Sequence, residues 1–112
     1  METEKTSREL AFEIIHRIHT NESYANILLP KILSTSSFER RERAFITELV
    51  YGTIRSKGTL DWIIEQFSSR KLNMIDPKIL DIIRLGCYQL IFTDKIPSHA
   101  ACNESVKIAK KY

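Results

Sequence analysis

Apolar side chains recur along this chain at the spacing of amphipathic helices. The first such segment has apolar residues at i, i+3, i+4 and i+7, which places them on one helix face. Thr6 precedes the segment and Glu9 follows three residues later, the pattern of a capping box. The sequence therefore predicts a first helix from Ser7 to about Ile18.

Two further helices are expected in the first half of the chain. One runs from Tyr24 to Leu33, with Ser23 as its N-cap and Pro30 as a source of irregularity. The next runs from about Phe38 to Arg55, after a polar loop of four Ser and Thr residues.

Two glycines then have different expected roles. Gly52 lies within the helical pattern, where glycine costs about 1 kcal/mol relative to alanine, so we expect another helix to approach it closely. Gly58 is expected to break the chain before a fourth helix at Leu60–Phe67.

The last third has clear helix boundaries. Asp76 is the expected N-cap of a helix that begins at Pro77 and is apolar nearly all round, as in a helix at the centre of a bundle. Ile96-Pro97 is a stop signal, and Ser98 is expected to cap a sixth helix with a basic outer edge.

These elements predict an all-α fold, a compact orthogonal bundle of about six helices. Connections of a few residues are typical of such bundles. Only three glycines and three prolines are present, too little turn material for an all-β domain. A length of 112 residues predicts a single domain, residues 1–112.

The charge pattern limits the function classes. The net charge is +3 and the pI about 9.0, which permits nucleic-acid binding without requiring it. No apolar run approaches the roughly 20 residues that span a bilayer, so no membrane partner is expected. Acidic residues follow Met1 where a signal peptide would be apolar, so we expect a cytoplasmic location.

No residue pattern predicts catalysis or a metal site. Cys87 and Cys102 are expected to be buried, reduced thiols, although His99 lies three residues from Cys102. His16 and His19 have the spacing of two metal ligands, but the sequence nominates no third. We therefore expect no enzyme activity, catalytic residue, metal or cofactor in this chain.

The basic residues are the remaining candidates for function. Arg40 and Arg41 lie near a helix start, where cations are unfavourable, so phosphate binding is one explanation and pairing with Glu39 and Glu42 another. Trp62 could stack on a base, but edge packing on its helix is the favoured interpretation. The RNA-binding candidates are Lys5, Arg8, Arg40, Arg41, Arg55, Lys57, Lys107, Lys110 and Lys111.

Several motifs together resemble the NusB-like RNA-binding domain. They include the runs SRELAFEIIHRI, YANILLPKIL, LVYGTIR, LGCYQL and IPSHAACNESVKIAK, in this order. The P-x-H-A-A run before N-E is similar to the version at the N-terminus of small-subunit rRNA cytosine-5 methyltransferases of the RsmB, Sun or Fmu type. The resemblance extends from about Arg8 to Tyr112.

The resemblance implies an all-α, non-catalytic module that docks small-subunit rRNA for a methyltransferase domain. S-adenosylmethionine is expected only in that domain, which is absent here, and the family's last helix is also absent, so we expect a fragment. Its partners would be RNA and its own methyltransferase domain. The alternatives are a NusB-type transcription antitermination factor with a ribosomal-protein partner, and a helical interaction domain that touches no RNA.

Overall fold

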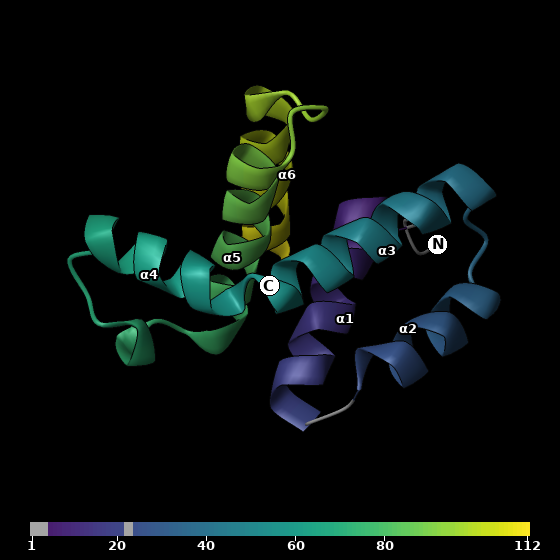
Figure 1. Ribbon diagram of the computed structural model, residues 1–112, viewed down its shortest axis with the longest axis horizontal. Helices are drawn as coiled ribbons and strands as arrows, with labels where there is room; N and C mark the ends of the chain where they lie inside the picture. The colour runs from purple at the N-terminus through teal and green to yellow at the C-terminus, as the bar shows by residue number, and fades with distance from the viewer. Residues whose placement is uncertain (1–4, 22–23) are drawn as a thin grey trace. The chain divides into compact units, whose positions relative to one another are not determined.

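All regular structure in the computed structural model, which describes residues 5–21 and 24–112, is helical (Figure 1). The elements are α1 (Ser7–Asn21), α2 (Ala25–Ser34), α3 (Arg40–Arg55), α4 (Lys57–Phe67), the 3-10 helix η1 (Leu72–Met74), α5 (Pro77–Phe92) and α6 (Ser98–Lys111). No strand occurs within the described ranges, and the prediction of an all-α fold is confirmed. None of the described helices is long and apolar enough to cross a membrane.

The chain divides into two compact units, Met1–Tyr51 and Gly52–Tyr112, with the boundary inside α3. In the first unit, α2 packs against α1 and buries Phe12, Ile15 and Leu29. Each fully buried side chain of this size contributes about 1.5–3 kcal/mol to folding.

The ends of α1 and α2 differ in how well local signals predicted them. The amide of Glu9 donates to the Thr6 hydroxyl at 3.1 Å, which confirms Thr6 as the cap, although α1 continues three residues beyond Ile18. Tyr24 occupies the N-cap position of α2 and makes no side-chain cap bond. The predicted cap, Ser23, lies outside the described residues.

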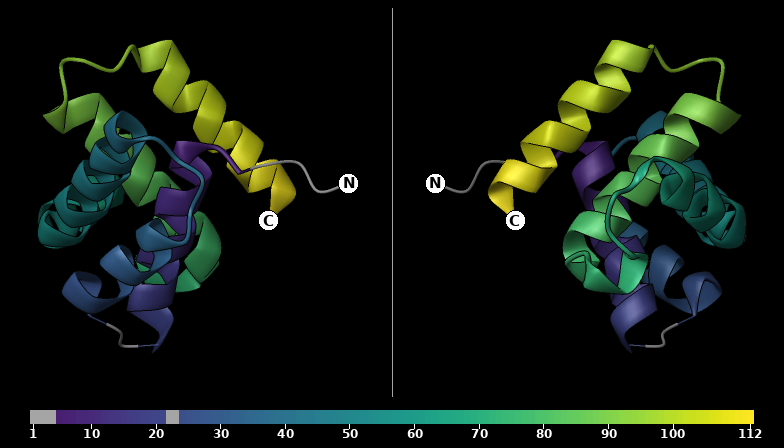
Figure 2. Two further views of the ribbon diagram at one scale, coloured as in Figure 1. Left: turned by 90° about the vertical axis from the view of Figure 1, so that its right-hand side faces the viewer. Right: turned by 90° about the vertical axis from the view of Figure 1, so that its left-hand side faces the viewer.

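In the second unit, α5 packs against both α4 and α6. Its start is confirmed, because the amide of Lys78 donates to Asp76 Oδ1 at 2.8 Å and Pro77 opens the helix. The chain reverses direction between α5 and α6 (Figure 2). Ser98 is the first residue of α6 rather than its cap, and Pro97 holds the N-cap position without a side-chain cap bond.

Close helix approach in the second unit depends on glycine. A Cβ added at Gly52 would overlap the phenol ring of Tyr88, which confirms the expectation that another helix lies against this glycine. A Cβ at Gly86 would lie 2.8 Å from Ser105 Oγ, so α5 and α6 also meet at a residue without a side chain.

Two predictions for this unit are wrong. Gly58 does not break the chain, because it lies inside α4 and the break falls at Ser56. Glycine does not by itself end a helix, because its cost of about 1 kcal/mol relative to alanine can be offset by the packing of the rest of the helix. α5 is also not apolar all round, because it buries Asp81 and Arg84 while Leu90 is exposed.

Candidate nucleic-acid interface

The start of α1 and the first turns of α3 lie side by side in the first unit. Ser7 Oγ donates to Glu42 Oε2 at 3.2 Å, and the Arg8 guanidinium lies over the Phe45 ring, 5.4 Å from its centroid. Lys5 Nζ forms an ion pair with Glu13 Oε2 at 2.6 Å. Arg8 therefore belongs to a packed helix, and the ammonium group of Lys5 is held in an ion pair.

Arg40 and Arg41 are exposed in the first turn of α3. Neither guanidinium forms an ion pair with another described residue, and the Glu42 carboxylate accepts from Ser7. Pairing with Glu39 and Glu42 therefore does not explain these cations. Their position is electrostatically unfavourable in the free protein, because the helix macrodipole is positive at this end.

Arg55 and Lys57 flank Ser56 where α3 ends and α4 begins, and both are exposed. Arg55 is in the last turn of α3, where the macrodipole favours a cation. Lys57 opens α4 instead of ending α3, so the same explanation does not apply to it.

The three C-terminal lysine candidates are exposed on α6. Lys107 Nζ lies 3.6 Å from Glu104 Oε1, a solvent-exposed pair that contributes little to stability. Lys110 and Lys111 are in the last turn, where they suit the macrodipole. Of the nine candidates, the first four by number belong to the first unit and the other five to the second.

The cysteines line one apolar groove of about 330 Å³ between α5 and α6. Cys87 is half-buried, and burial, assisted by the neighbouring Cys102 thiol, raises the pKa of Cys87. A raised pKa disfavours the nucleophilic thiolate, so Cys87 is poorly suited to catalysis. Cys102 is exposed, so the prediction that both thiols are buried is wrong for this residue.

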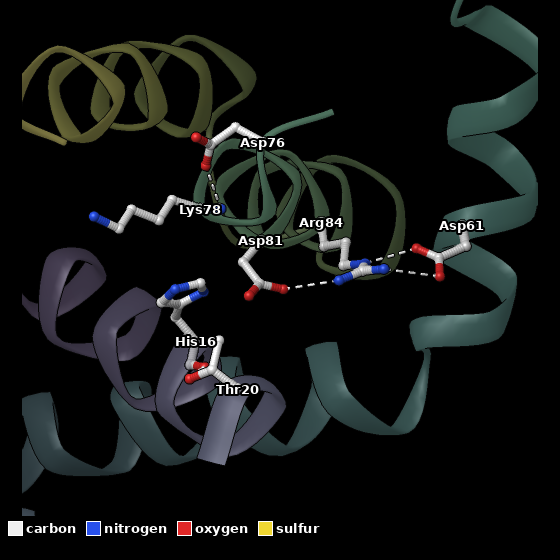
Figure 3. Close-up of polar contacts among 7 residues, drawn as sticks. All are labelled: His16, Thr20, Asp61, Asp76, Lys78, Asp81 and Arg84. Carbon is white, nitrogen blue, oxygen red and sulfur yellow. Dashed lines mark hydrogen bonds and ion pairs between the residues drawn. The ribbon is translucent and has the colours of Figure 1, made fainter. Parts of the chain in front are cut away.

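His16 of α1 has local partners. The His16 ring stacks on Phe12 with centroids 5.8 Å apart. The His16 carbonyl accepts from Thr20 Oγ1 at 2.8 Å, and Figure 3 shows these two residues. Across the described ranges, no group of three or more His, Cys, Asp or Glu side chains is arranged to hold a metal ion.

Sequence reasoning missed a buried ionic network in the second unit. Arg84 donates to both oxygens of Asp61 through Nε at 2.6 Å and Nη2 at 3.0 Å, and to Asp81 Oδ1 through Nη1 at 2.9 Å (Figure 3). Burial lowers the pKa of Arg84, but the bonds to both carboxylates outweigh it and raise that pKa. The i, i+3 spacing of Asp81 and Arg84 was the available signal.

Trp62 does not pack as predicted. Its side chain is 62% exposed on α4, and Gly58, one turn earlier, has open space around it. Edge packing on α4 is therefore the wrong interpretation of this residue.

Comparison with known proteins identifies relatives along nearly the whole chain. A Mycobacterium tuberculosis protein named as a methyltransferase is 41% identical over 103 residues, 92% of this chain and 22% of the relative. A Bacillus subtilis protein named as a probable ribosomal RNA small subunit methyltransferase B is 36% identical over 107 residues, 95% of this chain and 24% of the relative. The chain thus spans about a quarter of the length of these relatives.

A second kind of relative is named as NusB itself. The transcription antitermination protein NusB of Ruminiclostridium cellulolyticum is 28% identical over 109 residues, 96% of this chain and 75% of that protein. The solved structure of T. maritima NusB matches with a TM-score of 0.84 at 22% identity, over 100% of this chain and 80% of that chain. This structural match confirms the fold.

The family profile described as NusB family matches residues 5–112. That range includes all six α-helices and every candidate cation. The chain belongs to the NusB family.

Proposed function

We propose that this chain is an RNA-binding module that docks ribosomal RNA for a cytosine-5 methyltransferase domain. The observation that carries the proposal is the match of nearly the whole chain to proteins named as methyltransferases, at 41% and 36% identity, against 28% for the NusB protein above. A cytoplasmic location belongs to this proposal, because the named relatives are bacterial proteins of RNA metabolism.

The exposed arginine pair at the start of α3 supports RNA as the ligand. Arg40 and Arg41 have no ion-pair partner among the described residues, and an arginine fork matches phosphate geometry. A bound phosphate would also offset the unfavourable position of these cations in the helix macrodipole. Such contacts position an RNA without reading its sequence.

The chemistry of the proposed methyltransferase belongs outside these 112 residues. S-adenosylmethionine would be held by the catalytic domain, and we assign no catalytic role to Cys87 or Cys102. The raised pKa of Cys87 supports this assignment, because the thiolate needed for nucleophilic attack is disfavoured.

Replacing Arg40 and Arg41 together with alanine tests the arginine pair. We expect weaker binding of a labelled single-stranded RNA, and a salt dependence of log K that is less steep by about 1.4, the loss of two phosphate contacts. Fluorescence anisotropy titrations at several salt concentrations measure both quantities.

The matched control is the double variant Arg17→Ala and Lys31→Ala. It removes the same charge from exposed positions of the same unit, on α1 and α2. An equal loss of RNA affinity in both double variants would show that net charge alone is responsible. An unchanged affinity in the variant that lacks Arg40 and Arg41 would show that this pair is not part of the site.

The NusB relatives favour one second candidate, an antitermination factor that binds RNA with a ribosomal-protein partner. The match to 75% of the R. cellulolyticum NusB is the specific observation behind it. Retention of a ribosomal protein by the immobilised chain would favour this function over a methyltransferase module.

A further inference from the structure

Trp62 has an exposure that packing does not explain. It is the only tryptophan of the chain and the largest side chain on α4, yet 62% of it is in contact with solvent. Burying a side chain of this size removes about 150–250 Å² of surface from water. Because Trp62 is largely exposed, most of that stabilisation is absent in this fold.

The helical turn next to Trp62 leaves space beside the indole. Side chains of an α-helix lean toward the preceding turn, so the indole extends toward the residue four positions earlier, which is Gly58. A Cβ built at Gly58 meets no atom within 4 Å. A flat group could therefore lie against the indole on this side without displacing a side chain.

Two cations lie at the same corner. Arg55 ends α3 and Lys57 begins α4 (Figure 1), both are exposed, and within the described ranges neither is in an ion pair. Lys57 is about 7.5 Å from Trp62 along the helix axis.

The acidic residues of α4 do not cancel this positive charge. The Asp61 carboxylate is held by both nitrogens of Arg84. Glu65 lies one turn beyond Trp62, on the side away from Arg55 and Lys57.

We propose that this corner, formed by Arg55, Lys57, Gly58 and Trp62, is a contact for unpaired RNA. A base stacks on the indole beside Gly58, and Arg55 and Lys57 hold the flanking phosphates. Bases within a duplex are stacked on one another, so only an unpaired base offers its face to an aromatic ring. The inference rests on the proposed RNA binding and adds the kind of RNA and the residue that recognises it.

Intrinsic fluorescence reports on this corner directly, because Trp62 is the only tryptophan. The 112-residue chain is titrated at low salt with an oligouridine of about 12 nucleotides and, separately, with an RNA duplex of similar length. We expect the single strand to quench the fluorescence and the duplex to leave it nearly unchanged. Anisotropy of end-labelled RNA follows binding in parallel.

Trp62→Ala should weaken single-strand binding by about 5- to 150-fold, the range for loss of one base stack, and Trp62→Phe should retain part of it. Phe67→Ala is the matched control, because Phe67 is an aromatic residue on the same helix with 87% exposure. We expect Phe67→Ala to bind as the unchanged chain does.

The possible results distinguish the stacking site at Trp62 from RNA binding by the chain as a whole. Binding seen by anisotropy, with no quenching and no effect of Trp62→Ala, would overturn the stacking site while RNA binding stands. Absence of any RNA binding at low salt would defeat both. Should Trp62→Ala fail to fold by circular dichroism, equal quenching by single strand and duplex would still contradict the inference.

Discussion

The pairing and the exposure of individual side chains in this protein depend on residues that lie elsewhere in the sequence. A linear pattern does not reveal those residues. Arg84 is a cation that sequence reasoning did not nominate, and it is held by Asp61 and Asp81 inside the second unit. Trp62 is apolar, and its exposure depends on whether another element covers it, which local spacing does not determine. Exposed cations such as Arg40, by contrast, could be identified from the sequence because charged side chains rarely lose contact with water.

The Arg84 network predicts a specific stability defect. Arg84→Met should lower the free energy of unfolding by about 3 kcal/mol, at the low end of the range for a broken buried ion pair because Asp61 is partly exposed. Removal of the Arg84 cation would raise the pKa of the Asp81 carboxylate, which is 1% exposed, above its value in the unchanged chain. The deficit should therefore grow as the pH rises above about 4.

Urea unfolding at several pH values measures this defect. Adding Asp81→Asn to the Arg84→Met variant should restore part of the stability at neutral pH, because it removes the buried negative charge. A pH-independent deficit, or no recovery in the double variant, would contradict the assigned role of the network.

Helices were predicted well where a local signal determines their ends. Asp76 caps α5 and Thr6 caps α1 through bonds within the same few residues. The prediction failed at Gly58, because a glycine does not by itself end a helix. α3 ends at Arg55 and α4 begins at Lys57, so the break falls at Ser56. The role of Arg84 on α5 was missed in part because one of its two partners, Asp61, lies on α4.

The N-cap of α5 gives a prediction at the element scale. Asp76→Ala should lower the free energy of unfolding by about 1 kcal/mol, because the amide of Lys78 loses its acceptor. Thermal unfolding followed by circular dichroism measures this change. Asp94→Ala, which removes an exposed aspartate between α5 and α6, serves as the control and should have little effect; equal losses would show that charge, not capping, is responsible.

At the scale of the whole molecule, membership of the NusB family accounts for the helical fold. The sequence motifs predicted that family correctly, whereas composition alone would have indicated only a helical domain of mild positive charge. The candidate cations are divided between the two compact units, four in the first and five in the second. We propose that these exposed cations bind RNA phosphates.

The most direct test is a titration of single-stranded RNA with the 112-residue chain at about 50 mM and about 200 mM salt. With about four phosphate contacts, the slope of log K against log salt is about −2.8, so we predict saturable binding at the lower concentration and a loss of about 50-fold at the higher one. No binding at the lower salt concentration, or an affinity that does not change with salt, would contradict the account.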